Sequence, residues 1–442
     1  MPRTPGLESS ISTKRRRIAE LAQATPTLAL TTLAHHMDLA WMQEAYRRTR
    51  KDGATGVDRQ TAAEFAENLD DNLRALLEAA KSGRYQAPPV RRAYIPKADG
   101  RRRPIGIPTF ADKVLQRAVA MLLEPIYETD FLDCSYGFRP ERSAQDALAA
   151  LWEQMMDIQG GWVLEFDIEG YFDAIKLREL MRMLRQRIRD GVVLRLIGKW
   201  LKAGVLEEGR HYRPETGSPQ GGVVSPLFSN LYLHEVLDQW FEEIVKPRLY
   251  GKGALIRYAD DGVLLFEREE DAHRVLAVLH KRFEKYGLKL HPEKTRLVRF
   301  QRPRIPPRSS TEGSRAGTFR FLGFTHYWGR TRRGNWAVKR RTAPDRFSRA
   351  MVAFKQWCRR NRHRPLREQC RMLSQKLRGH YGYYGIPGNS TALGRFRFEV
   401  VRIWRKWLSR RSDRAHIPWA RWQRLAARYA LPEPRIRPQA VA

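Results

Sequence analysis

The sequence predicts an α+β protein with a core of alternating strands and helices and a strongly basic, helical C-terminal region. Apolar runs typical of strands occupy residues 162–173, 254–259, 262–266 and 295–300, with helical patterns between them. Their order is β-α-β-β-α-β, which is that of a split βαβ unit. The second observation is the charge, because most of the basic excess lies in the last quarter of the chain.

The segments that precede this core alternate in the same way. Helical periodicity covers residues 33–50, 64–81 and 112–127. Residues 92–97 and 103–108 predict a β-hairpin, because an Asp-Gly turn joins the two runs and basic residues surround that turn.

Three aspartates of the core are candidate functional residues. Asp167 lies in the first run, and the hairpin of the second and third runs presents Asp260 and Asp261 at its tight turn. Helical patterns at residues 177–188 and 271–286 complete the unit. The alternative interpretation is that Asp260 and Asp261 form only a polar turn pair.

Charge restricts the possible partners. Lys and Arg number 82 against 48 Asp and Glu, a formal net charge of +34, which favours a large polyanion such as nucleic acid over a merely soluble basic enzyme. Residues 331–442 hold 29 Lys and Arg but five Asp and Glu, a local charge of +24. A polyanion-binding region is therefore predicted there, joined to the core between the Pro-rich run 301–310 and a last strand that ends near Trp328.

Other classes of protein are disfavoured. No stretch reaches the roughly 18 to 20 apolar residues that span a bilayer, and no signal-peptide core follows the first residue, so we expect no membrane attachment and a cytoplasmic, nucleoid-associated location. Cys134, Cys358 and Cys370 are widely spaced without a C-x-x-C pair. Neither a disulfide framework nor a thiolate zinc site is predicted.

The three acidic residues suit one kind of chemistry. Two-metal nucleotidyl transfer needs a pair of divalent ions about 3.5 to 4 Å apart. Mg²⁺ prefers carboxylate oxygens and keeps several waters, so a few Asp side chains on stiff strands suffice. Asp167 can meet Asp260 and Asp261 if their strands are neighbours in the sheet.

Several sequence blocks that occur in a fixed order are together far more specific for one family than any single block. Tyr258-Ala259-Asp260-Asp261 resembles the Y-x-D-D signature of reverse transcriptases, and the surrounding blocks are similar to the group II intron subfamily. These blocks are residues 95–97 with 103–108, 135–140, 167–173, 217–222 with 225–227, 287–295 and 321–324. The resemblance spans roughly residues 50–330.

The resemblance implies a right-hand polymerase. Residues 1–50 would form a basic arm and a helix, residues 51–160 the fingers, residues 161–330 the split-βαβ palm, and residues 331–442 a helical basic thumb with the RNA-binding segment called domain X. Asp167, Asp260 and Asp261 would hold two Mg²⁺ ions as catalytic residues, and Ile168 would add its backbone carbonyl as a ligand beside the nucleotide.

The resemblance also implies roles for five further residues near the nucleotide and primer. Phe172 would lie beneath the sugar and exclude a 2′-hydroxyl, unless it is an ordinary strand aromatic. Lys97 and Arg103 would neutralise the triphosphate, unless they belong to a solvated loop. Gln220 would contact the nucleotide from a Gly-rich turn whose role is otherwise structural. Lys294 would brace the palm near the primer, or is a surface lysine.

The C-terminal region is similar to the thumb and domain X through residues 378–389 and a helix over residues 396–409. Trp404, Trp407 and His380 are expected to pack into apolar surroundings. The predicted RNA contacts are the basic residues Arg402, Arg405, Lys406 and Arg410.

The resemblance implies as partners a group II intron RNA, an RNA template with a DNA primer, deoxynucleoside triphosphates and a target DNA. Without paired cysteines, an HNH endonuclease domain is not expected, and the protein should not cut its own DNA target. Two alternatives stay open: a host-adapted reverse transcriptase in phage defence or DNA repair, and a non-catalytic splicing factor. The retained carboxylates and Phe172 argue against the second alternative, and Phe172 also argues against a primer-independent RNA polymerase.

Overall fold

The fold is that of a computed structural model, which describes residues 5–96, 100, 102–207, 210–212, 221–303, 317–412 and 415–436. Lys97 and Gln220, two of the predicted nucleotide contacts, lie outside the described residues. Helices and strands alternate along the chain, and three buried apolar clusters support the elements. The predicted α+β class agrees with this mixture.

The N-terminal part is helical and packs around one long helix. Helix α5 (Phe110–Asp130) is flanked by α1 (Pro5–Ala24) and α2 (Leu39–Arg48), and Trp41 donates a 3.0 Å hydrogen bond to the Ala118 carbonyl. The basic arm is thus part of a packed helix.

Two helix predictions in this part were wrong, one in where the helix begins and the other in its continuity. The helix expected from residue 33 begins at Leu39, because the Asp38 carboxylate caps the Trp41 amide and only the short 3₁₀ turn η1 (Ala34–His36) precedes it. The helix expected over residues 64–81 is two helices, α3 (Ala62–Glu67) and α4 (Leu69–Ser82), because Asn68 leaves the helical backbone conformation.

The predicted N-terminal hairpin is confirmed and belongs to a small sheet. Strand β1 (Val90–Pro96) pairs antiparallel with β2 (Arg102–Ile107). On its other side β1 pairs in parallel with β4 (Val205–Glu207), which continues antiparallel to β5 (Arg210–Tyr212). A segment within residues 161–330 therefore completes a sheet that begins within residues 51–160.

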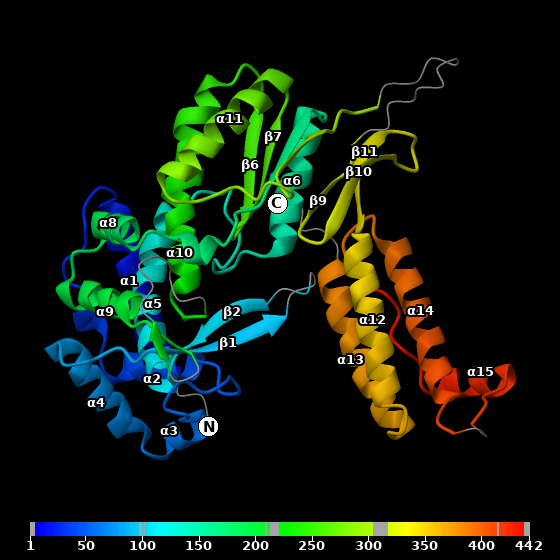
Figure 1. The fold of residues 1–442 in the computed structure, drawn as a ribbon, viewed down its shortest axis with the longest axis horizontal. Helices are drawn as coiled ribbons and strands as arrows, with labels where there is room; N and C mark the ends of the chain where they lie inside the picture. The colour runs from blue at the N-terminus through cyan, green and yellow to red at the C-terminus, as the bar shows by residue number, and fades with distance from the viewer. Residues whose placement is uncertain are drawn as a thin grey trace.

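The central sheet confirms the predicted β-α-β-β-α-β order. Its strands lie in the order β6-β7-β3-β8, all antiparallel, with bounds β6 (Gly253–Tyr258), β7 (Asp261–Phe266), β3 (Trp162–Phe166) and β8 (Arg296–Arg299). Alternate residues enter different apolar clusters, so that Val163 packs with α6 (Ala144–Ile158) and Leu164 with α11 (Glu269–Lys285). The two helices therefore cover opposite faces of the sheet (Figure 1).

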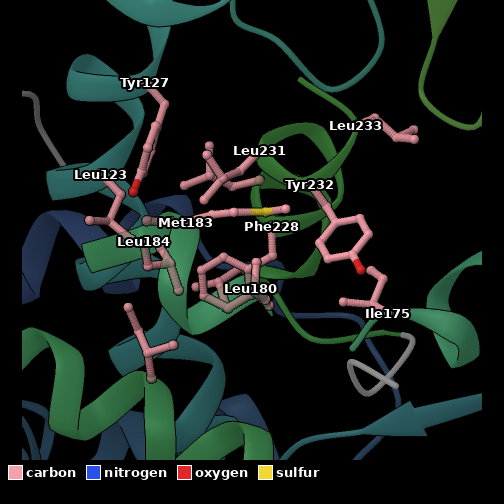
Figure 2. Close-up of a cluster of buried hydrophobic side chains, with 14 of the residues drawn as sticks. Leu123, Tyr127, Ile175, Leu180, Met183, Leu184, Phe228, Leu231, Tyr232 and Leu233 are labelled. Carbon is pink, nitrogen blue, oxygen red and sulfur yellow. The ribbon is translucent and has the colours of Figure 1, made fainter. Parts of the chain in front are cut away.

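Further helices close the core between β3 and β6. They are α7 (Tyr171–Ala174), α8 (Leu177–Arg187), α9 (Gly191–Lys202) and α10 (Ser225–Leu233). The chain after α10 continues through two π-helical stretches, η2 (His234–Asp238) and η3 (Trp240–Val245), and a 3₁₀ turn, η4 (Lys246–Arg248). Figure 2 shows how Phe228 and Leu231 of α10 face Leu180, Met183 and Leu184 of α8.

The C-terminal region begins with strands and ends with helices. Strands β9 (Phe319–Phe321), β10 (Phe324–Arg330) and β11 (Trp336–Thr342) form a sheet in the order β11-β10-β9. The strand expected to end the core near Trp328 is β10, and it pairs with β11, so this sheet extends across the expected boundary at residue 330.

The helices of this region follow directly (Figure 1), and their buried side chains share an apolar cluster. They are α12 (Pro344–Arg360), α13 (Leu366–Tyr384), α14 (Ser390–Leu408) and α15 (Trp419–Arg428). In the described part of the chain, none of the helices has the length and apolar character that crossing a bilayer requires.

Candidate active site

The strand register brings the three predicted catalytic carboxylates to one edge of the central sheet. Phe166 of β3 pairs with Gly262 of β7, so the next residues outward, Asp167 and Asp261, lie opposite each other. Tyr258 pairs with Asp261, which leaves Ala259 and Asp260 as a two-residue turn, with Ala259 in the left-handed region at φ 57°. Acidic groups separated by most of a hundred residues in sequence therefore share one edge.

The carboxylates raise one another's pKa values through electrostatic repulsion. Desolvation, together with the negative charges of Asp260 and Asp167, raises the pKa of Asp261 to about 6. Desolvation also raises the pKa of Asp260, with a contribution from Asp167. Asp261 remains accessible to solvent, so water and small ions can reach its carboxylate. Such repulsion is relieved when a cation binds.

Basic side chains partly compensate this negative charge. Lys294 Nζ donates a 2.6 Å hydrogen bond to Asp167 Oδ2. The positive charge of Arg103, on the exposed end of β2, lowers the pKa of Asp260 against the larger desolvation effect. Arg346, in the first turn of α12, acts in the same sense on Asp261. Lys294 and Arg103 are thus brought to the carboxylates, and Arg346 is a neighbour that the sequence did not indicate.

The backbone of Ile168 has the direction that a metal ligand on this edge needs. Ile168 forms an isolated antiparallel bridge with Leu290, in which His291 N donates to the Asp167 carbonyl (2.8 Å) and Glu169 N donates to the Lys289 carbonyl (2.8 Å). In this pattern the amide and carbonyl of the bridged residue point away from the partner strand, here toward the side of β7.

The donor set suits Mg²⁺ better than a metal held in a cage of side chains. Among the residues that the structure describes, no group of three or more His, Cys, Asp and Glu side chains is placed to hold a metal ion. Mg²⁺ usually takes one or two carboxylates and completes its shell with water and substrate phosphates. The repelling carboxylates of Asp167, Asp260 and Asp261, with the Ile168 carbonyl, fit such an open site.

Phe172 lies beside this edge but not on a strand. Strand β3 ends at Phe166, and Gly170, at φ 55°, starts the short helix α7 that carries Phe172. The prediction of a continuous strand to residue 173 was therefore wrong. Phe172 is buried and packs edge-on against Tyr171 at 5.4 Å, and Tyr171 donates a 2.6 Å hydrogen bond to the Ser229 carbonyl. The negative charge of Asp260 contributes to the raised pKa of the buried Tyr171, which shows that α7 adjoins the acidic turn.

The Gly-rich segment before α10 approaches the hairpin of β1 and β2. A Cβ atom on Gly221 would lie 2.3 Å from the Gly106 carbonyl oxygen, and Val223 N donates a 2.8 Å hydrogen bond to Gln116 Oε1. The chain that leads out of residues 213–220 therefore lies against β2.

Two further residues hold the acidic turn, and sequence reasoning had not singled them out. Gly137 packs so closely that a Cβ atom there would lie 2.3 Å from the Ala259 amide nitrogen. Arg257 is fully buried and forms an ion pair with Asp238 at 2.6 Å. A signal for Arg257 was present, because a charged residue inside an apolar strand needs a buried partner. No comparable signal pointed to Asp238.

Three of the predicted RNA contacts, Arg402, Arg405 and Lys406, lie on α14, and Arg410 follows its C-terminal end. Arg402 and Lys406 are exposed, although Arg402 Nη1 lies 3.3 Å from Glu399 Oε1. Arg405 stacks over Trp419 at 4.6 Å and also donates a 3.3 Å hydrogen bond to the Ile417 carbonyl. Arg410 is exposed, 5.8 Å from the ring centre of Trp407.

The aromatic residues of this region pack as predicted. Trp404 is buried, donates a 3.0 Å hydrogen bond to Gln369 Oε1 and meets Trp422 edge-on. Trp407 is half-buried at the rim of the same cluster. His380 stacks on Phe396 at 3.8 Å.

The N-terminal basic arm differs from a free RNA-binding arm. Lys14 pairs with Asp38, and Arg15 lies 3.1 Å from Glu124 on α5. These two side chains are thus engaged within the protein.

Comparison with known proteins agrees with this geometry. The family described as "Reverse transcriptase (RNA-dependent DNA polymerase)" matches residues 95–326. Protein YkfC of Escherichia coli K12 is 40% identical over 240 residues, which are 53% of this chain and 63% of that protein. The group II intron-encoded protein LtrA of Lactococcus lactis is 42% identical over 184 residues, which are 41% of this chain and 30% of LtrA.

A more distant relative has a name of the same kind. Nuclear intron maturase 2 of Arabidopsis thaliana is 29% identical over 177 residues, covering 31% of this chain and 24% of that protein. The chain thus spans less than two thirds of the length of each of these relatives. The family match covers more than half of the chain, and the mixed helix-and-sheet fold is of the polymerase type. This chain therefore belongs to the reverse transcriptase (RNA-dependent DNA polymerase) family.

Proposed function

We propose that this protein extends a DNA primer on an RNA template by two-metal nucleotidyl transfer. The observation that carries the proposal is the shared edge of Asp167, Asp260 and Asp261, with Arg103 and Lys294 beside it. Acidic groups that repel one another support a site for divalent cations, which reverse transcriptases generally use. Neighbouring cations support a site for a triphosphate.

The proposed roles follow from where each group lies. Asp167, Asp260, Asp261 and the Ile168 carbonyl would hold two Mg²⁺ ions. When bound, these ions would lower the pKa of the attacking primer hydroxyl and stabilise the leaving pyrophosphate. Arg103 would balance the charge of the triphosphate, as we also expect of Lys97.

Three residues would position the substrates. The buried ring of Phe172 would fill the space of a ribose 2′-hydroxyl and thereby select deoxynucleotides. Lys294 would hold Asp167 in place near the primer end, and Gln220 would contact the incoming nucleotide. In a right-hand polymerase of this kind, the sheet of β1, β2, β4 and β5 would belong to the fingers and the central sheet to the palm. Helices α12 to α15 would form the thumb and domain X.

The experiment that tests the activity combines two measurements. Asp260→Asn and Asp167→Asn should each abolish primer extension on an RNA template with Mg²⁺, because each loses a charged metal ligand. RNA affinity should stay near that of the parent, since no phosphate contact is removed. Asp157→Asn is the matched control, because Asp157 forms an exposed ion pair with Lys252 at the far end of β6. Substantial extension by either of the first two variants would refute the assignment.

We also propose that the protein binds group II intron RNA and assists its splicing and mobility as a maturase, with a target DNA as a further partner. The local charge of +24 over residues 331–442 supports an extended contact with RNA. The names of the relatives LtrA and Nuclear intron maturase 2 point in the same direction. A cytoplasmic, nucleoid-associated location belongs to the same proposal and is supported by the net charge of +34. Splicing of a precursor RNA, with and without the purified protein, tests the maturase activity.

A further inference from the structure

The turn that carries Asp260 and Asp261 rests on a buried arginine. Arg257, on the last part of β6, has no exposed surface. Its Nη1 atom donates a 2.9 Å hydrogen bond to the carbonyl of Ala259, the residue in the left-handed conformation that starts the turn. A non-glycine residue rarely adopts this conformation without support from its surroundings. The guanidinium group thus binds the strained residue next to the carboxylates.

The same guanidinium group gathers three other segments. Its Nε and Nη2 atoms donate to the two carboxylate oxygens of Asp238 at 2.8 and 2.6 Å. Nη1 also donates to Asn230 Oδ1 at 3.0 Å, and Nη2 donates to Ser135 Oγ at 2.6 Å. The guanidinium group thus links the acidic turn to three other segments of the chain.

One of these partners also holds the backbone that packs on the turn. Asn230 Nδ2 donates a 2.7 Å hydrogen bond to the carbonyl of Gly137, whose Cα atom lies against Ala259. The backbone of Arg257 bonds to the same segment, since Arg257 N donates to the Cys134 carbonyl at 2.7 Å and Tyr136 N donates to the Arg257 carbonyl at 2.9 Å. Residues 134–137 and the turn therefore form one connected unit.

The partner carboxylate lies on an unusual backbone. Asp238 is fully buried and ends the π-helical stretch η2, which directly follows α10. π-Helical turns inside helices are rare and often occur at functional sites, because the wider turn redirects the side chains that follow it. Here the side chain so placed is the bidentate partner of Arg257.

We infer that Arg257 and Asp238 are positioning residues that set the place of the metal-binding carboxylates Asp260 and Asp261. Neither residue would touch a metal or a substrate. Arg257 would act through the Ala259 carbonyl, and Asp238 would act by fixing the plane and direction of the guanidinium group. For its role in catalysis this inference rests on the proposed function, but its effect on metal binding is independent of polymerase activity.

A second buried pair provides a comparison of like chemistry. Arg187 donates a 2.8 Å hydrogen bond to Asp130 and further bonds to the carbonyls of Ala22, Thr25 and Leu28. This arginine is also almost fully buried, yet its partners belong to the N-terminal segment and α5. If a buried arginine matters only for stability, the two sites should respond alike to the same substitution.

The experiment compares Arg257→Lys with Arg187→Lys in the full chain. Lysine keeps the charge but lacks the planar fork, so it cannot hold Asp238, Asn230, Ser135 and Ala259 together. Ser135→Ala is the milder variant, because it removes one acceptor from Arg257 and little volume. Mn²⁺ affinity, measured from the paramagnetic resonance signal of free Mn²⁺ without nucleic acid, reports the carboxylates directly, and Asp260→Asn defines the loss of the site. Thermal unfolding midpoints are recorded for every variant.

Arg257→Lys should weaken Mn²⁺ binding by roughly 10- to 100-fold, the range seen when a group that orients metal ligands is removed. Ser135→Ala should weaken Mn²⁺ binding less. Arg187→Lys should leave the Mn²⁺ affinity unchanged even if its unfolding midpoint falls as far as that of Arg257→Lys. In primer extension, Arg257→Lys should lower kcat and raise the Mg²⁺ concentration for half-maximal rate, with KM for the nucleotide nearly unchanged.

Three results would overturn the inference. The first is unchanged Mn²⁺ affinity in a folded Arg257→Lys or, if that variant does not fold, in Ser135→Ala. The second is an equal loss of affinity in Arg187→Lys, which would show a general effect of instability. The third is a parent protein that binds Mn²⁺ no better than Asp260→Asn. A parent that binds Mn²⁺ but extends no primer would instead refute the proposed function, and the metal affinities would still support the positioning role.

Discussion

Gly137→Ala should inactivate the protein through a single methyl group. The added Cβ atom would lie 2.3 Å from the Ala259 amide nitrogen, 2.9 Å from the Tyr258 carbonyl carbon and 3.1 Å from the Ala259 Cα atom. All three are backbone atoms, so no side-chain rotation relieves the contact. Gly137 itself does not have a positive φ, so the cost comes from the contact and not from the backbone conformation of alanine.

The magnitude follows from how far the turn must move. Ordinary van der Waals contact begins at 3.4 Å, so the turn and residue 137 must separate by about 1 Å. Hydrogen bonds from Asn230 to Gly137 and from Tyr136 to Arg257 oppose a movement of the 134–137 segment. A misplacement of about 1 Å in a catalytic group costs about 100-fold in rate. The overpacking itself should reduce the free energy of unfolding by about 1 to 3 kcal/mol.

The assay is steady-state primer extension at saturating nucleotide and Mg²⁺, with the unfolding midpoint measured in parallel. Gly198→Ala is the matched control, because Gly198 lies within α9 and a Cβ atom there meets nothing within 4 Å. Alanine at a free helical position should stabilise the protein by about 0.5 to 1 kcal/mol and leave the rate unchanged. A folded Gly137→Ala variant with a rate close to that of the parent would show that the turn tolerates this displacement, and the reasoning would be wrong.

Three further outcomes are expected. Phe172→Val should increase ribonucleotide incorporation relative to deoxyribonucleotide, because it opens space beside the sugar, and an unchanged ratio would remove Phe172 from that role. Replacement of the exposed Arg402, Lys406 and Arg410 by Gln should lower RNA affinity. It should also flatten the slope of log affinity against log salt concentration by roughly 0.7 to 0.9 per lost phosphate contact. An unchanged slope in the folded variant would place the RNA contact elsewhere. Burial raises the pKa of Asp112 to about 6 from an ordinary 3.8, so the folded state binds this proton more tightly and stability falls as the pH rises between those values. Asp112→Asn, which keeps an acceptor for Tyr85 and Trp200, should therefore raise the unfolding midpoint at pH 8 and have little effect at pH 4; equal shifts at both values would contradict this.

The sequence by itself determined the order of the core elements and the residues of the acidic edge. Continuous apolar runs and a tight turn identified the hairpin that carries Asp260 and Asp261, and the first run identified Asp167. These features are local, because short apolar runs and turn formation depend on a few neighbouring residues. Local patterns failed where a competing local interaction decided, as at Asp38, which caps α2, and at Asn68, which separates α3 from α4.

The tertiary structure alone decided how the acidic edge is held. Arg257 is a charged residue in an apolar strand, a signal that the sequence interpretation did not use, and its partner Asp238 could not be chosen among the acidic residues of the chain. Gly137 likewise gave no sign that its missing side chain admits the backbone of Ala259. A buried charge and a close backbone contact are both satisfied by groups from elements far apart in sequence, so their partners depend on strand register and on packing between helices. Those relations exist only once the whole chain has folded.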